Sequence, residues 1–97
     1  MNDGSVLRPS QAKALLVKIL TEGGNVEFRP HARQEMAKDG ITELQVLSVL
    51  RGGVVEPAES INGEWRYRVR VLPIYVVVTF IAQTYMAVVT AWKRKRP

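Results

Sequence analysis

The chain has 97 residues, of which 46% are hydrophobic and 24% charged, a balance that favours one folded domain and argues against disorder. Lysine and arginine number 14 against 9 acidic residues, and the resulting net charge of +5 favours an anionic partner such as nucleic acid. The lack of cysteine excludes disulfides and thiolate sites, and with a single histidine we expect no metal and no cofactor.

The first half of the sequence predicts helices. After a loose arm over residues 1–9 we expect three of them, over residues 11–21, 30–38 and 42–51. The third begins with a capping-box pattern, in which Thr42 bonds the amide of Gln45 and the Gln45 side chain bonds back. Its buried side is expected to include Leu44 and Leu47, together with Val46 and Leu50. A short extended piece over residues 25–29 separates the first two helices.

After residue 53 the hydrophobic period changes to that of strands. These are expected over residues 54–61, 64–72, 74–82 and 84–94. Pro57 makes the first an edge or irregular strand, and Asn62-Gly63 is a strong hairpin signal.

This order of elements predicts one α+β domain over residues 1–97. Two to three helices (10–53) would pack on one face of a three- to four-stranded antiparallel sheet (54–94). A basic tail would follow over residues 95–97.

The stretch from Val71 to Trp92 has no charged residue and is followed by a basic run, so a membrane span is one reading. Pro73, Gln83 and the wealth of β-branched residues favour two antiparallel strands instead. We therefore expect no membrane attachment. With no secretory signal at the start of the sequence, we expect a cytoplasmic protein.

The strand around Trp65 carries a row of arginines. Side chains alternate between the two faces of a strand, so Arg66, Arg68 and Arg70 share one face, opposite an apolar face that includes Tyr67. Two readings remain open. The row is a solvated face paired with nearby glutamates such as Glu56, Glu59 and Glu64, or it binds phosphate through the guanidinium forks.

His31 is the only side chain whose ordinary pKa suits proton transfer near neutral pH. It follows Pro30 at the start of the second helix, where backbone amides attract anions. Arg33 lies two residues further on, and Glu35 lies one turn on, within reach of the imidazole ring. The alternative is a helix-start histidine satisfied by the backbone or by Glu35.

The last strand ends with Thr90 and Trp92 on one face and Lys93 on the other. We expect Trp92 in the core. Whether Thr90 lies on the core side or beside the arginines depends on the strand register, and both placements remain open. The basic run over residues 93–96 attracts phosphate or serves as a solubilising tail.

Four segments together resemble a bacterial domain family of unknown function. They are a Phe28-x-x-His31-Ala32-x-x-x-Met36 helix signature, then Gly40-Ile41-Thr42, then Val46-x-x-Val49-Leu50-Arg51-x-Gly53, and a final strand ending in Val88-Val89-Thr90-Ala91-Trp92. That family is similar to RelE/ParE-type toxins and to related small metal-independent RNases. The resemblance implies a RelE-like fold, an endoribonuclease activity and a cognate antitoxin protein. It also implies working residues at His31, Arg66, Arg68 and Thr90.

From these features we expect a toxin-like endoribonuclease that cleaves RNA through the RNA's own 2′-hydroxyl, on the ribosome or off it. His31 would be its general base or acid. Arg66, Arg68 and Thr90 would stabilise the reacting phosphate. Flanking phosphates would be bound by Arg33, Arg70 and Lys93. The alternative is a non-catalytic basic module that binds RNA or an acidic partner protein.

Overall fold

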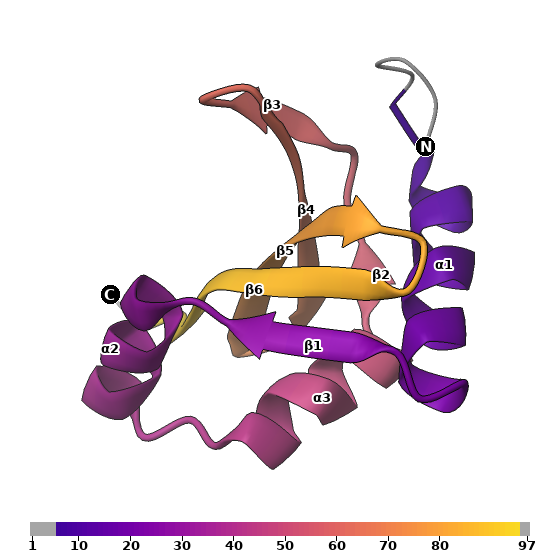
Figure 1. Cartoon of the computed structure of the whole chain (residues 1–97). Helices are drawn as coiled ribbons and strands as arrows, with labels where there is room; N and C mark the ends of the chain where they lie inside the picture. The colour runs from indigo at the N-terminus through magenta and orange to yellow at the C-terminus, as the bar shows by residue number, and fades with distance from the viewer. Residues whose placement is uncertain (1–5, 96–97) are drawn as a thin grey trace.

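The computed structural model describes residues 6–95 and shows an α+β domain with a six-stranded sheet (Figure 1). The helices are α1 (Pro9–Thr21), α2 (Pro30–Asp39) and α3 (Glu43–Gly52). The strands are β1 (Asn25–Phe28), β2 (Val54–Val55), β3 (Glu59–Ile61), β4 (Glu64–Val71), β5 (Ile74–Ala82) and β6 (Tyr85–Lys93). The α+β class is confirmed. Most of the expected arm (residues 1–5) and the end of the expected basic tail (96–97) lie outside the described residues.

The sheet differs from the expected one in strand number and direction. Its strand order is β1-β6-β5-β4-β2, with β3 paired to another part of β4. β1 runs parallel to β6, with Asn25 opposite Tyr85, whereas the other pairs are antiparallel. The prediction of three or four antiparallel strands was therefore wrong. A strand of four residues is too short to show its period, and the element interrupted by Pro57 forms two short strands.

Local signals place the helix and turn boundaries well. The Thr42 hydroxyl accepts a hydrogen bond from the Gln45 amide at 3.1 Å, and the Gln45 side chain accepts one from the Thr42 amide at 2.9 Å. The predicted capping box at the start of α3 is thus confirmed. The β3–β4 turn is the predicted hairpin, in which Asn62 (φ 51°) and Gly63 (φ 79°) both adopt left-handed backbone conformations.

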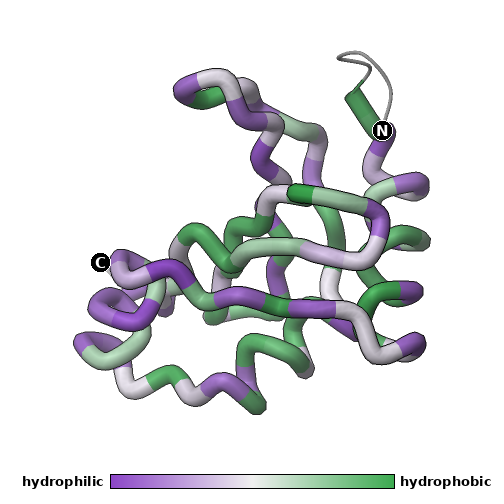
Figure 2. Tube along the Cα trace, in the orientation of Figure 1, coloured by the Kyte–Doolittle hydropathy of each residue, from purple (hydrophilic) through white to green (hydrophobic). Residues whose placement is uncertain are grey.

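The helices leave one face of the sheet uncovered. α1 and α3 contact each other and the sheet, and their buried side chains join the inward-facing residues of β4, β5 and β6 in one core. α2 packs against β6 beyond the end of β1 and contributes Ala32 and Met36 to this core (Figure 1). Figure 2 shows α2 mostly in hydrophilic colours, which agrees with the burial of only Ala32 and Met36 in this helix.

The third helix buries only part of the expected side. Val46 and Leu50 are buried as expected, together with Val49, whereas Leu44 is 79% exposed, so its predicted burial was wrong. Leu44 lies in the first turn of α3, on the side of the helix away from these three residues.

An irregularity in β6 changes which face its later residues occupy. Val78 pairs with Val88, but the preceding residue of β5, Val77, pairs with Thr90, so Val89 is an extra residue in the ladder. Before this bulge, Met86 and Val88 point into the core. After it, Ala91 points into the core and Thr90 lies on the opposite face. The bulge therefore decides the register question in favour of the arginine side.

The uncharged stretch after residue 71 forms β5 and β6. Within residues 6–95, no helix is long and apolar enough to cross a membrane.

Candidate functional site

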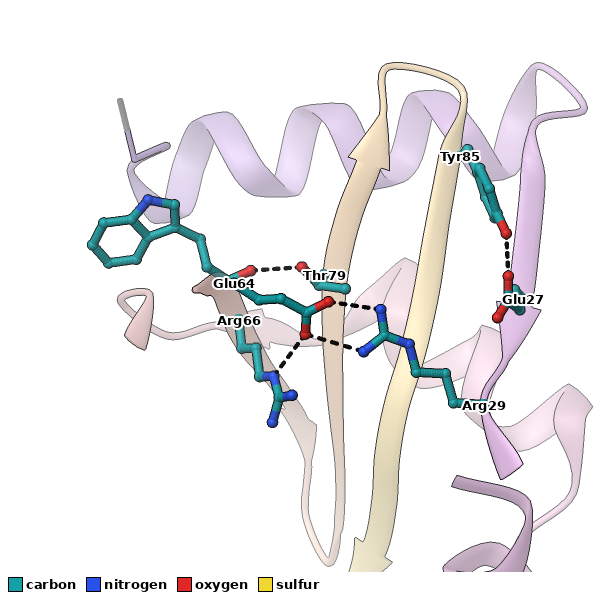
Figure 3. A network of polar contacts seen from close by, with 7 residues as sticks. Glu27, Arg29, Glu64, Arg66, Thr79 and Tyr85 are labelled. Carbon is teal, nitrogen blue, oxygen red and sulfur yellow. Dashed lines mark hydrogen bonds and ion pairs between the residues drawn. The ribbon is translucent and has the colours of Figure 1, made fainter. Parts of the chain in front are cut away.

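The face of the sheet that α1 and α3 leave uncovered, here called the open face, carries the arginine row. It is made of side chains from the three longest strands and from their neighbours on β3: Glu59, Ile61, Arg66, Arg68, Arg70, Tyr75, Val77, Thr90 and Trp92. Figure 3 looks onto this side of the sheet, with α1 behind the strands.

The alternation predicted for β4 is confirmed. Tyr67 and Val69 are buried on the helix side, whereas Arg66, Arg68 and Arg70 lie on the open face. Only the ends of the apolar side are incompletely covered: Trp65 is 36% exposed and Val71 is 47% exposed. The sequence pattern therefore placed the arginines correctly relative to the core.

One carboxylate holds two arginines at the beginning of β4. Arg29 donates two parallel hydrogen bonds to Glu64, at 3.0 and 2.7 Å, and Arg66 donates a third from Nε at 3.1 Å (Figure 3). The bonds from Arg29, with the one from Arg66, lower the pKa of Glu64. The Arg29 side chain crosses β6 to reach Glu64, beside the buried Thr79 of β5.

A second carboxylate holds the other two arginines. Glu56, which lies between β2 and β3, accepts hydrogen bonds from Arg68 at 3.0 and 2.7 Å and from Arg70 at 3.0 Å. The bonds from Arg68 are the main reason why the pKa of Glu56 is lowered. The paired reading of the arginine row is thus correct for Glu56 and Glu64, although each arginine keeps N–H groups that these carboxylates do not occupy.

A hollow of about 160 Å³ lies between the two carboxylate clusters. Its lining residues are Glu59, Ile61, Arg66, Arg68, Val77, Thr90 and Trp92. Three of the four residues predicted to be catalytic, Arg66, Arg68 and Thr90, therefore meet at one place. Thr90 reaches it only because of the extra residue at Val89.

An aromatic pair forms part of the open face. Trp92 stacks on Tyr75, with ring centroids 5.2 Å apart and planes 8° from parallel. The guanidinium of Arg68 lies 5.6 Å from the centroid of the same tyrosine ring. The expected burial of Trp92 in the core was wrong, because the bulge turns this side chain away from the helices.

His31 lies apart from the hollow. It is exposed at the second position of α2, two residues after Arg29, and it is not among the lining residues. Within residues 6–95 its imidazole makes no hydrogen bond or ion pair. Glu35, the expected partner of the imidazole, instead pairs with Lys38 at 3.1 Å.

The other predicted RNA-binding residues are spread over the molecule. Arg70 lies on the open face beside Tyr75. Arg33 projects from α2, where it pairs with Glu43 at 2.6 Å and covers the ring of Phe28. Lys93 ends β6 on the face opposite Trp92, and its amide donates a hydrogen bond to Asp39 at 2.8 Å.

The sequence assigned no role to Tyr75, Ile61 or Arg29, and it indicated Glu59 only as an ion-pair partner of the arginines. The alternation of β5 places Tyr75 and Val77 on one face. Its pairing with Trp92 in the sheet then places Tyr75 on the open face. Glu59 and Ile61 reach the hollow because the hairpin pairs them opposite Arg66 and Glu64. Arg29 stands inside the His31 signature, but no local pattern indicates its partner 35 residues away.

The fold and the site define a small α+β domain with an arginine-lined hollow on an uncovered sheet face. Residues 28–93 match the sequence family described as a domain of unknown function, DUF4258, and the chain belongs to that family. The matched segment includes both carboxylate clusters and every residue that lines the hollow. No curated protein and no solved structure matches the chain.

Proposed function

We propose that the protein is a toxin-like endoribonuclease that binds RNA across the open face and acts in the cytoplasm. The observation that carries the proposal is the meeting of Arg66, Arg68 and Thr90 at one hollow. Guanidinium groups offer forked donors to phosphate oxygens, and a hydroxyl adds a further donor. Donors of these two kinds stabilise the negative charge that develops on a reacting phosphodiester.

In the proposed reaction the 2′-oxygen of a ribose attacks the adjacent phosphorus, and the bond from phosphorus to the 5′-oxygen of the next nucleotide breaks. The products are a 2′,3′-cyclic phosphate and a 5′-hydroxyl end. A base takes the proton of the 2′-hydroxyl, and an acid returns a proton to the leaving 5′-oxygen. His31 is proposed for one of these roles, which requires the bound RNA to extend to the start of α2.

The guanidinium of Arg66 is preorganised for binding a phosphate. Glu64 engages its Nε, which fixes the plane of the guanidinium, and its two terminal amino groups have no protein partner in the described part of the chain. Arg70 would bind a neighbouring phosphate on the open face. Arg33 on α2 and Lys93 at the end of β6, which lie off this face, would contact the RNA where it extends beyond the end of β6. A cognate antitoxin would act by covering this face, and a ribosome could present the RNA to it.

A second candidate is a non-catalytic module that binds RNA or an acidic protein. The observation that favours it is the pairing of all four arginines around the hollow with Glu56 and Glu64. His31, the proposed proton-transfer group, also lies outside the hollow. Such a module would depend on the arginines and not on His31.

The deciding experiment combines growth and RNA cleavage for the wild type and three variants, His31→Ala, Arg66→Gln and Thr90→Val. Arg51→Ala serves as the matched control, because Arg51 is exposed at the end of α3 and does not line the hollow. The endoribonuclease predicts growth arrest after induction and cleavage that a 2′-deoxy residue at the cut site abolishes. Both effects should survive Arg51→Ala and be lost in the other variants. RNA binding without cleavage by the wild type would contradict the enzyme and support the module.

A further inference from the structure

We propose that the hollow on the open face binds an unpaired nucleobase stacked on Trp92. This inference rests on the proposed RNA binding and deepens it, because it makes single-stranded RNA the ligand. It does not depend on cleavage, so it applies to both candidate functions.

The first argument is the presentation of Trp92. The indole is only partly exposed, packs against Tyr75 at a centroid distance of 5.2 Å, and also lines the hollow. Tyr75 belongs to β5 and stands between Arg68 of β4 and Trp92 of β6, in contact with both. The ring of Trp92 is therefore held in place before any ligand arrives, which lowers the entropic cost of stacking a base on it.

The second argument is the chemistry of the lining. A phosphate needs only donors and positive charge, yet Trp92, Val77 and Ile61 make much of this hollow apolar. A flat base suits such a mixture, because its faces are apolar and its edge is polar. The volume of about 160 Å³ is also below the roughly 300–1,000 Å³ of ordinary small-molecule pockets, which fits one ring system at a time.

The third argument is a carboxylate without a hydrogen-bond partner. Glu56 and Glu64 are each held by two arginines, whereas the side chain of Glu59 makes no ion pair or hydrogen bond with any residue in the range 6–95. Glu59 lines the hollow opposite Arg66. Its carboxylate can accept a hydrogen bond from an N–H group on the base edge while Arg66 donates to the adjoining phosphate.

These features select single strands. In a duplex the base faces are stacked and the Watson–Crick edges are paired, so neither Trp92 nor Glu59 could reach them. An unpaired base can leave the stack and enter the hollow with its phosphate directed toward the arginines. Stacking on an aromatic side chain tolerates every base, so affinity would depend more on strandedness than on sequence.

The two tryptophans of the chain allow a direct test. Trp65→Phe leaves Trp92 as the only indole, and Trp92→Phe leaves Trp65, which lies on the helix side of β4. Each variant is titrated with a single-stranded RNA oligonucleotide and with inorganic polyphosphate, which has the charge but no bases. RNA should quench the emission of Trp65→Phe strongly, whereas polyphosphate should not. The emission of Trp92→Phe should change little with either ligand.

Affinity gives an independent readout. Trp92→Leu should bind single-stranded RNA roughly 5- to 150-fold more weakly, and its affinity for polyphosphate should be unchanged. Trp65→Leu is the matched control and should retain both affinities, with circular dichroism confirming that both variants fold. Equal binding of RNA and polyphosphate, with no response of Trp92, would overturn the base site and leave anion binding intact. If RNA does not bind at all, the proposed function fails as well.

Discussion

Arg29, at the start of α2, holds the carboxylate of Glu64, at the start of β4, through two hydrogen bonds of 3.0 and 2.7 Å. Arg29 directly follows β1, and β6 and β5 lie between β1 and β4 in the sheet, so the pair connects segments that are not neighbours in the strand order. Only 28% and 29% of the two side chains are exposed. The pair is therefore better shielded than an ordinary surface ion pair.

Replacing Arg29 with methionine should lower the free energy of unfolding by about 1–2 kcal/mol, because Glu64 loses its two strongest hydrogen bonds while staying half-buried. Urea unfolding measures the effect. Lys38→Met is the control, since Lys38 belongs to the same helix and its ion pair with Glu35 is more exposed. That variant should change stability by about 0.5 kcal/mol or less. Equal losses in the two variants would contradict the special role of Arg29.

The two lowered carboxylate pKa values predict acid sensitivity. Arginine hydrogen bonds lower the pKa of both Glu56 and Glu64 in the folded state, so the unfolded chain binds more protons once the pH falls to about 4.3. Their stabilisation is present above that pH and is lost as the pH falls through the folded pKa values. Urea midpoints between about pH 6 and pH 3 should show this decline. Glu64→Gln should make it shallower, whereas an unchanged slope would contradict the assignment.

The carboxylates also limit how strongly the open face attracts anions. Glu56→Gln removes one negative charge beside Arg68 and Arg70 and leaves the side-chain volume nearly unchanged. If these arginines bind phosphate, the affinity for single-stranded RNA should rise several-fold and its salt dependence should steepen. Fluorescence anisotropy at two salt concentrations measures both. Glu43→Gln, which frees Arg33 on α2, is the control and should have a smaller effect.

The side chain of Lys13 in α1 caps the C-terminal end of α3. Its ammonium donates to the carbonyl oxygens of Leu50, Arg51 and Gly53, at 3.2, 2.8 and 2.8 Å. Lys13→Met should therefore destabilise the protein by about 1–3 kcal/mol, because three carbonyls lose a charged donor. Lys18→Met, at an exposed position of the same helix, should be nearly neutral in urea unfolding. A neutral Lys13→Met would show that water replaces the ammonium without cost.

Tyr67 attaches the segment before α1 to the sheet. Its buried hydroxyl accepts a hydrogen bond from the Leu7 amide at 2.9 Å and donates one to the Leu7 carbonyl at 3.2 Å. Tyr67→Phe should lower stability by about 1–2 kcal/mol. Burial raises the pKa of Tyr67, so the wild type should also lose stability as the pH rises above about 10. In Tyr67→Phe that alkaline decline should be smaller, and an identical decline in both proteins would contradict the prediction.

Local patterns made much of the fold predictable. The capping box at Thr42, the hairpin at Asn62-Gly63 and the alternation of β4 each depend on residues a few positions apart, and all three are confirmed. The parallel pairing of β1 with β6 depends on residues about 60 positions apart, such as Asn25 and Tyr85. No local period indicates such a pairing, so the sequence could not predict it.

The candidate site was also only partly predictable from local sequence patterns. The arginines were identified from alternation alone, but the face of Thr90 and Trp92 depends on the single extra residue at Val89. A strand without that bulge would send both side chains toward the helices. The roles of His31 and of the predicted phosphate ligands remain predictions, to be tested by the variants proposed above.

The position of β6 has a consequence for the synthesis of the protein. β6 is the last strand of the described chain, yet it lies inside the sheet, between β1 and β5. While a nascent chain is still missing this strand, β1 has no neighbour, and Thr90 and Trp92 have not yet joined the arginines. The hollow therefore forms only after translation has passed residue 93, so a chain stalled earlier carries the arginines but no assembled site.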